Sequence, residues 1–176
     1  MSSQDVKTVR VQGSKPASSK DKAASKSPRR RSRELALQGL YQWRLGANDA
    51  AAIEAHLQEL DGFSKADREL CFNLIRGVLV QHVQLQEMLS TCIDRPFAEL
   101  SPVEACILMI GALELSDYPA TPYPVIINES IELAKSFGGT DGHRYVNGVL
   151  DKLAARLRPT EVEARQQPSA RSPRHG

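Results

Sequence analysis

The segment SPVEACILMIGALEL, residues 101–115, decides the fold, because it is apolar on almost every side of the helix that it predicts. Ser101 suits the cap of a helix N-terminus, Pro102 suits the first turn, and Glu104 can bond back to the cap. A helix with no polar face is stable only when other elements cover it on all sides. We therefore expect this segment to be the central, buried helix of a helical domain.

The segments on either side of it show the apolar spacing of amphipathic helices, with little of the alternation that predicts strands. Connections between them are short, so neighbouring helices are expected to pack antiparallel. The sequence therefore predicts an all-α fold of about seven helices. Besides the central one, the expected helices cover about residues 29–45, 50–60, 65–89, 124–137 and 141–156.

Capping residues predict where three of these helices begin or end. Ser64 and Asp67 resemble a capping box at the start of the long third helix. The pair Gly138-Gly139 is expected to end the helix before it in a left-handed conformation. Asp141 is expected to cap the helix that follows.

Charge is distributed unevenly along the chain. Residues 1–33 hold ten Lys or Arg and two Asp, whereas residues 34–157 hold nine Lys or Arg and seventeen Asp or Glu. Segments 1–28 and 159–176 are poor in large apolar side chains, so we expect them to be disordered. The predicted organisation is a basic extension at 1–28, a folded domain at 29–158 and a tail at 159–176. A basic segment followed by an acidic body favours a polyanionic partner such as nucleic acid.

Several features of the sequence indicate the cellular compartment and argue against a metal or cofactor. No apolar run approaches the 18–20 residues of a membrane span, and the N-terminus lacks an apolar signal segment. Cys71, Cys92 and Cys106 are widely spaced and odd in number, which argues against a disulfide framework and against a zinc site. We expect a cytoplasmic protein with no membrane association, no metal and no cofactor.

Four arginines begin the first predicted helix and make a candidate nucleic-acid site. Helical spacing places Arg31, Glu34 and Gln38 on one face. The planar guanidinium group suits phosphate oxygens, and an amide such as Gln38 can donate to and accept from base edges. The candidate residues are Arg29, Arg30, Arg31, Arg33 and Gln38.

The corner between the last two predicted helices is the second candidate site. It gathers polar and charged residues in a short stretch, and Tyr145 could stack on an unpaired base. The alternative is a simple helical corner with Tyr145 packed inside. The residues concerned are Lys135, Asp141, His143, Arg144 and Tyr145.

Catalytic motifs are not evident in the sequence. The only glycine pair follows a helix rather than a strand, so it is not a phosphate-binding loop. Glu129 and Glu132 could imitate a catalytic carboxylate pair, but a solvated face or a capping role is the expected one. The sequence therefore indicates a binding protein and not an enzyme.

Three separated motifs carry a family resemblance. RRRSRELALQGLYQW (29–43), PYPVIINESIELAKSFG (122–138) and HRYVNGVLDKL (143–153) resemble the NusB family of bacterial transcription antitermination factors. The resemblance covers about residues 29–158. It implies an all-α, NusB-like fold of two three-helix bundles packed at a steep angle, with no enzymatic activity.

The resemblance also implies partners. Family members pair with the ribosomal protein NusE, bind the single-stranded boxA element of nascent RNA, notably from ribosomal RNA operons, and help the RNA polymerase antitermination complex read through terminators. It implies RNA contact at the arginine cluster and at the corner, and a NusE-facing side at two further residues. The chain departs from some relatives at Ala98, which replaces an acidic residue beside Glu99. The corner residues matched are Lys135, Phe137, Asp141 and Tyr145, and the partner-facing residues are Tyr41 and Glu104.

The sequence leaves two alternative functions to consider. NusB-like domains also occur next to rRNA methyltransferase domains, so the chain could be an RNA-grasping domain without catalysis of its own; no segment of it resembles a Rossmann-like methyl-donor site. A DNA-binding helix-turn-helix protein would need several outward base-reading side chains on its recognition helix. Residues 141–153 are a poor candidate for that helix, because they begin Asp-Gly-His.

Overall fold

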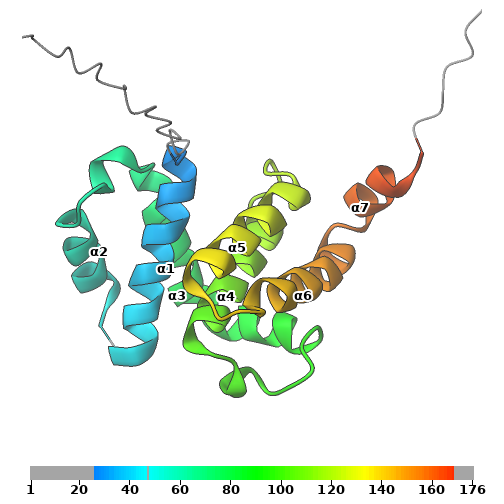
Figure 1. Cartoon of the computed structure of the whole chain (residues 1–176), viewed down its shortest axis with the longest axis horizontal. Coiled ribbons are helices and arrows are strands. Elements are labelled where there is room, and N and C mark those ends of the chain that lie inside the picture. The colour runs from blue at the N-terminus through cyan, green and yellow to red at the C-terminus, as the bar shows by residue number, and fades with distance from the viewer. Residues whose placement is uncertain (1–25, 47, 169–176) are drawn as a thin grey trace, which may run out of the picture.

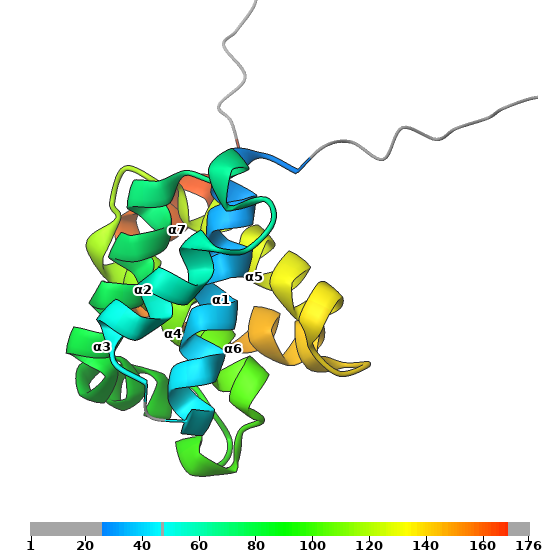
Figure 2. The same cartoon turned by 90° about the vertical axis from the view of Figure 1, so that its left-hand side faces the viewer.

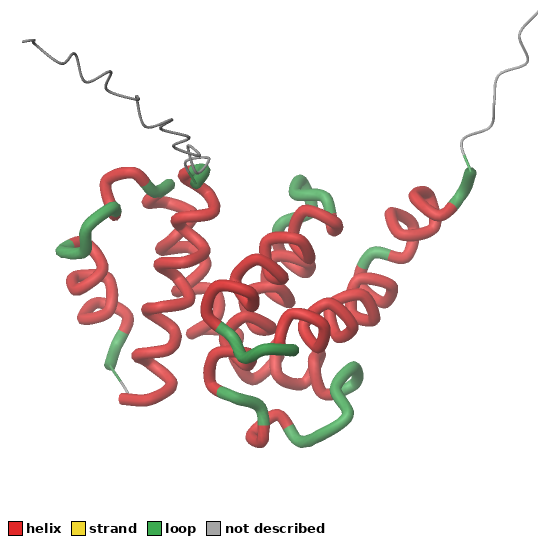
Figure 3. Tube along the Cα trace, in the orientation of Figure 1, coloured by secondary structure: helices red, strands yellow, loops and turns green. Residues whose placement is uncertain are grey.

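The computed structural model describes residues 26–46 and 48–168, and every regular element within these ranges is a helix (Figure 1, Figure 3). Predictions about residues 1–25 and 169–176 lie outside the described residues. The all-α fold is confirmed. The elements are α1 (Pro28–Gly46), α2 (Ala50–Gln58), the short 3-10 helix η1 (Phe63–Lys65), α3 (Arg68–Ser90), the 3-10 helix η2 (Phe97–Glu99), α4 (Pro102–Asp117), α5 (Tyr123–Phe137), α6 (Gly142–Leu157) and α7 (Pro159–Gln166).

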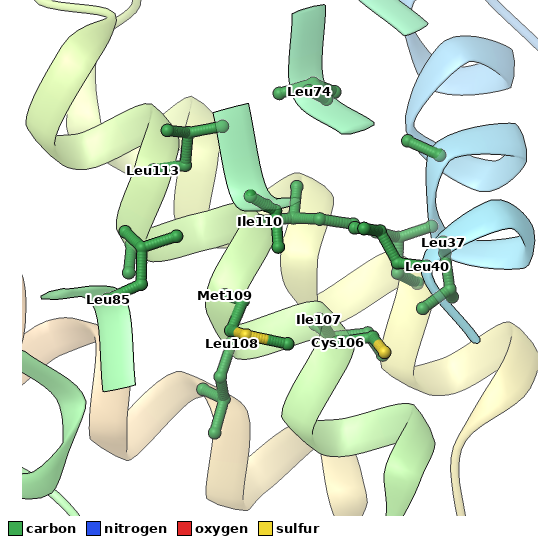
Figure 4. Close-up of a cluster of buried hydrophobic side chains, with 14 of the residues drawn as sticks. Leu37, Leu40, Leu74, Leu85, Cys106, Ile107, Leu108, Met109, Ile110 and Leu113 are labelled. Carbon is green, nitrogen blue, oxygen red and sulfur yellow. The ribbon is translucent and has the colours of Figure 1, made fainter. Parts of the chain in front are cut away.

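Helix α4 is the centre of the molecule, as its apolar sequence predicts. Every residue from Ala105 to Leu115 is buried, and α4 packs against α1, α3, α5 and α6. Figure 4 shows its side chains meeting leucines of α1 and α3 in one apolar cluster. The approach of α6 is close at Gly111, where an added Cβ would lie 2.8 Å from a methyl carbon of Leu150. Only glycine allows the two helices to come this near.

Two groups of three helices meet at α4. Helices α1, α2 and α3 contact one another, and so do α4, α5 and α6. Contacts of α4 with α1 and α3 join the groups, which we call the first and second bundles. Figure 2 shows α1 lying between α2 on one side and α5 and α6 on the other. The first helix therefore borders both bundles.

Helix starts match the capping predictions at two positions and differ at others. The Ser101 hydroxyl accepts a hydrogen bond from the Glu104 amide at 3.2 Å, as expected. The Asp67 carboxylate caps α3 by accepting from the Leu70 amide at 3.1 Å. The predicted start of this helix near residue 65 is wrong, because residues 63–65 form the separate η1 and Ser64 makes no cap bond.

The turn between α5 and α6 differs from its prediction. Gly138 has φ −90° and ψ 179°, an extended conformation and not a left-handed one. A glycine is needed at position 138 for a different reason, because a Cβ there would lie 2.6 Å from the Ala134 carbonyl oxygen. Asp141 stands at the N-cap of α6 but makes no side-chain cap bond.

The predicted disordered tail from residue 159 is wrong over 159–166, which form α7. Buried Arg158 anchors this helix. Its guanidinium group donates to the carbonyl oxygens of Glu114, Leu115, Tyr118 and Thr121 at 2.6–3.0 Å. It also pairs with Glu161 of α7 at 3.1 Å. The sequence resembles a tail because mainly polar contacts attach α7: the bonds of Arg158, and the Tyr123 amide of α5, which donates to Glu161 at 2.8 Å. Val162 adds a partly buried apolar contact.

Candidate nucleic-acid interface

The four arginines at the start of α1 do not form a single array, because their side chains reach different surroundings. Arg33 is buried, and its Nε and Nη2 atoms donate to the Glu114 carboxylate at 2.7–3.2 Å. Burial lowers the pKa of Arg33, but its hydrogen bonds to Glu114 and the negative charge of Glu114 together raise the pKa overall. The predicted RNA contact at Arg33 is therefore replaced by a structural role: its charge is already neutralised inside the protein.

Arg30 is also paired, but at the surface. Its Nε and Nη2 atoms donate to the two carboxylate oxygens of Glu129 on α5, each at 3.1 Å. The Arg30 side chain keeps 38% of its surface exposed and that of Glu129 keeps 17%. The hydrogen bond to Glu129 raises the pKa of Arg30. Glu129 is thus a partner of the arginine cluster and not part of a solvated carboxylate face.

Arg31 and Gln38 lie on the same face of α1, as their spacing predicts. With Glu34 and Asp61 they line a small recess of about 90 Å³ between α1 and the loop after α2. The Lys26 ammonium group approaches Glu34 on this face, at 2.8 Å from its carboxylate. The recess is mainly polar, and Gln38 is exposed at its edge. This face is open to a polar ligand.

Arg29 lies apart from Arg31. It is exposed and lines a wide cleft of about 760 Å³ between the start of α1, α3 and the loop after α4. Asp67, Asp117 and Glu129 contribute carboxylates to the same cleft. Acidic residues therefore lie beside both Arg29 and Arg31.

An apolar recess of about 160 Å³, which we call the α1–α5 recess, lies beyond Gln38. It brings together two predicted RNA residues, Gln38 and Phe137, and the predicted partner residue Tyr41. Leu37 and Val103 complete its lining. The side chains of Tyr41 and Phe137 remain 38% and 40% exposed. Exposed aromatic rings beside an amide can serve either an unstacked base or a protein side chain.

The corner between α5 and α6 keeps most of its polar groups in solvent. Lys135 is exposed and 3.7 Å from Glu132, and Asp141 is exposed. Tyr145 is half-buried: its hydroxyl donates to Asp94 at 3.3 Å and the Arg95 guanidinium lies 4.9 Å from its ring centre. Burial and the nearby Asp94 charge raise the pKa of Tyr145. Tyr145 therefore packs partly against the core, and its stacking on an unpaired base stays a prediction.

Glu104, predicted to face a protein partner, is half-buried. Its carboxylate lies against the start of α6, with one oxygen 3.0 Å from the position that a Cβ of Gly142 would take. A negative charge at a helix N-terminus is favourable, because the free amides there carry partial positive charge. Glu104 therefore orients α6 relative to α4, and part of its surface remains available.

The structure joins the two motifs that the sequence keeps about a hundred residues apart. Gln38 borders both the polar recess at Arg31 and the α1–α5 recess at Phe137, so one continuous surface runs along α1 to the end of α5. Sequence reasoning missed Glu114 and Glu129 as arginine partners. The available signal was Glu114 itself, the one acid within the apolar run 105–115, which predicts a buried cation beside it.

The described residues hold no group of three or more His, Cys, Asp or Glu arranged to bind a metal ion. In the same part of the chain, no helix combines the length and the apolar character that crossing a membrane requires.

The fold and this surface define an all-helical binding module of two bundles sharing a central buried helix. The model of the NusB family matches residues 30–155, so the chain belongs to the NusB family. It is 64% identical over 146 residues to the transcription antitermination protein NusB of Dechloromonas aromatica (strain RCB), covering 83% of this chain and 90% of that protein.

Solved structures agree with this assignment. T. maritima NusB superposes with a TM-score of 0.67 and 29% identity, covering 79% of this chain and 99% of that one. A chain from the crystal structure of antitermination factors NusB and NusE in complex with double-stranded RNA superposes with a TM-score of 0.67 at 19% identity, covering 72% and 96%. At that identity the likeness shows the fold alone. The NusB-like fold expected from the three motifs is confirmed.

Proposed function

We propose that this chain is a non-enzymatic, RNA-binding transcription antitermination factor of the cytoplasm. Together with the ribosomal protein NusE it binds boxA RNA in nascent transcripts, notably those of ribosomal RNA operons, and helps RNA polymerase read through terminators. The observation that carries the proposal is the 64% identity to an antitermination protein over nearly the whole folded region. The continuous surface from Arg31 to Phe137 supports it.

The proposed RNA surface consists of Arg31, Gln38 and Phe137, with Arg29, Arg30 and the corner residues Lys135, Asp141 and Tyr145 around it. Sequence-specific RNA recognition uses unpaired bases, which can stack on aromatic rings and bond to amides. Gln38 and Phe137 supply those two groups at one recess. Arg33 is left out of this surface because it is buried.

The proposed partner surface begins at Tyr41 and includes the exposed part of Glu104. Because Tyr41 lines the same recess as Phe137, RNA and NusE would meet at a shared edge. This shared edge would let RNA and NusE bind better together than either binds alone. The acidic body, with seventeen acids against nine bases over residues 34–157, suits a basic ribosomal protein.

The test is RNA binding by the full chain with and without NusE, using boxA RNA and a scrambled RNA of equal length. We expect boxA to bind more tightly than the scrambled RNA, and NusE to increase the difference. Equal binding of both RNAs under both conditions would contradict the proposal. Tyr41→Ala should reduce the increase in boxA preference that NusE causes. Lys152→Ala, which removes an exposed charge on α6, should leave this increase unchanged.

A further inference from the structure

Arg30 differs from the other proposed RNA-contacting arginines, because its side chain is partly exposed and is already paired with Glu129. Its bidentate pair with Glu129 uses Nε and Nη2, one of the two edges at which a guanidinium group can hold a pair of oxygens. The contact joins α1 to α5 across ninety-nine positions of sequence, so it is a tertiary contact and not a local one. The carboxylate occupies an edge that suits a phosphate equally well.

We propose that Glu129 is an internal competitor for Arg30, which RNA must displace, so that Glu129 sets how tightly the chain binds RNA. This inference rests on the proposed function. A carboxylate and a phosphate present similar pairs of oxygens to the same guanidinium edge. Arg30 cannot offer that edge to both anions at once. The Arg30 contact with RNA is then an exchange of partners.

The contrast between Arg30 and Arg33 separates an exchangeable pair from a structural one. Arg33 and Glu114 are 4% and 1% exposed, so no phosphate can reach them. The Arg30 side chain is 38% exposed, so a ligand can reach it from solvent. Partly exposed pairs contribute little net stability, because water screens them and can replace either partner. The Arg30–Glu129 pair can therefore open at small cost.

Glu132 offers a matched control on the same helix. It lies one turn after Glu129, is more exposed, and pairs with Lys135 instead of Arg30. Replacing either acid with glutamine removes one negative charge near the proposed RNA surface. Only the Glu129 substitution frees Arg30, whereas Glu132→Gln also frees Lys135. The decisive comparison is therefore Glu129→Gln with and without Arg30→Ala, because Glu132 and Lys135 are unchanged in both.

The experiment measures boxA RNA affinity, with NusE present, for the full chain and for Glu129→Gln, Glu132→Gln, Arg30→Ala and the double variant Glu129→Gln/Arg30→Ala. We expect Glu129→Gln to tighten binding about two- to fivefold beyond Glu132→Gln, the range of a partly exposed ion pair. This gain should vanish when Arg30 is alanine. Circular dichroism and thermal unfolding confirm that each variant folds.

Two results would overturn the inference. A gain that persists in the Arg30→Ala background would show that Glu129 acts only through its charge. Weaker binding by Glu129→Gln would show that Glu129 orients Arg30 for RNA instead of competing with it. Both results leave the proposed function standing, whereas a full chain that binds no boxA RNA with NusE present would remove both.

Discussion

The Arg33 guanidinium and the Glu114 carboxylate form a buried ion pair that ties α1 of the first bundle to α4 of the second, with Nη2 to Oε1 at 2.7 Å. Arg33 lies in a run of arginines that predicts a nucleic-acid site, but its ion pair with Glu114 stabilises the fold. Glu114 takes part twice, because its backbone carbonyl also accepts from Arg158 at 3.0 Å. Glu114 therefore contacts two buried arginines: Arg33, which links the bundles, and Arg158, which holds the start of α7 to the end of α4.

Breaking the Arg33–Glu114 pair should destabilise the fold strongly. Arg33→Met leaves the Glu114 charge buried without a partner, and we expect a loss of about 3–5 kcal/mol in the free energy of unfolding. The double variant Arg33→Met/Glu114→Leu should recover most of this loss, because an apolar pair needs no compensation. Urea unfolding followed by circular dichroism measures the effect.

The control for that substitution is Arg29→Met, an exposed arginine one turn earlier on the same helix. It should change stability by no more than about 0.5 kcal/mol. Equal effects of the two substitutions would mean that Arg33 is not the buried link between the bundles.

Arg31 should contribute to RNA affinity through charge. Arg31→Ala is expected to weaken boxA binding and to reduce the slope of log affinity against log salt by about 0.7, the value for one phosphate contact on a single strand. Arg30→Ala should weaken binding as well, but less, because Arg30 must first leave Glu129. Arg156→Ala in the last turn of α6 is the control. An unchanged slope for Arg31→Ala would remove this residue from the site.

Removing residues 1–25 should cost much less RNA affinity than Arg31→Ala. The deletion is placed there because Lys26, Ser27 and Pro28 contact the folded domain: Lys26 pairs with Glu34, and the Ser27 hydroxyl accepts from the Arg30 amide at 3.2 Å. Fluorescence anisotropy with boxA RNA compares the two chains. A larger loss from the deletion than from Arg31→Ala would move the main site into residues 1–25.

Arg158 should be essential for stability although it lies at the edge of the predicted tail. Arg158→Ala removes a donor from four carbonyl oxygens, of which only those of Glu114 and Tyr118 keep a backbone donor, and we expect a loss of about 3 kcal/mol. Arg158→Lys should recover little, since one ammonium group cannot match the spread of the guanidinium nitrogens. Thermal unfolding compares these variants with Arg165→Ala, an exposed residue of α7. A midpoint that Arg158→Ala leaves unchanged would contradict this anchoring role.

Stability should fall at alkaline pH because of two buried thiols. Burial raises the pKa of Cys71 and of Cys106 from 9.0 to about 12. The folded state keeps both protons while the unfolded chain loses them, so this contribution is complete below pH 9 and declines as pH rises to about 12. The decline is about 1.4 kcal/mol per pH unit for each thiol.

Denaturant unfolding at several pH values measures this decline. The double variant Cys71→Ala/Cys106→Ala should start from a lower stability because it leaves cavities, but its stability should fall less steeply above pH 9. The same steepness in the variant and the unchanged chain would show that these thiols do not control the alkaline limit.

Much of the fold could be predicted because the signals for it are local. Capping by Ser101 and the apolar circumference of α4 follow from neighbouring residues, and both were confirmed. The end of α5 at Phe137 was confirmed, but the left-handed conformation expected after it was wrong, because a glycine serves equally for a left-handed turn and for a close approach. The α7 helix was missed because its attachment to Arg158 depends on carbonyls more than thirty residues away.

The sequence by itself determined helices α1 to α6, the central place of α4 and membership of the family, because periodicity, caps and motifs are all local features of the chain. Only the tertiary structure decided what each arginine at the start of α1 does. Successive side chains of a helix point about 100° apart, so Arg30, Arg31 and Arg33 meet different neighbours. Arg30 meets Glu129 of α5 and Arg33 meets Glu114 of α4, whereas Arg31 lines a recess with Asp61 of the loop after α2. The fold thereby separates an exchangeable charge, a buried one and an open one.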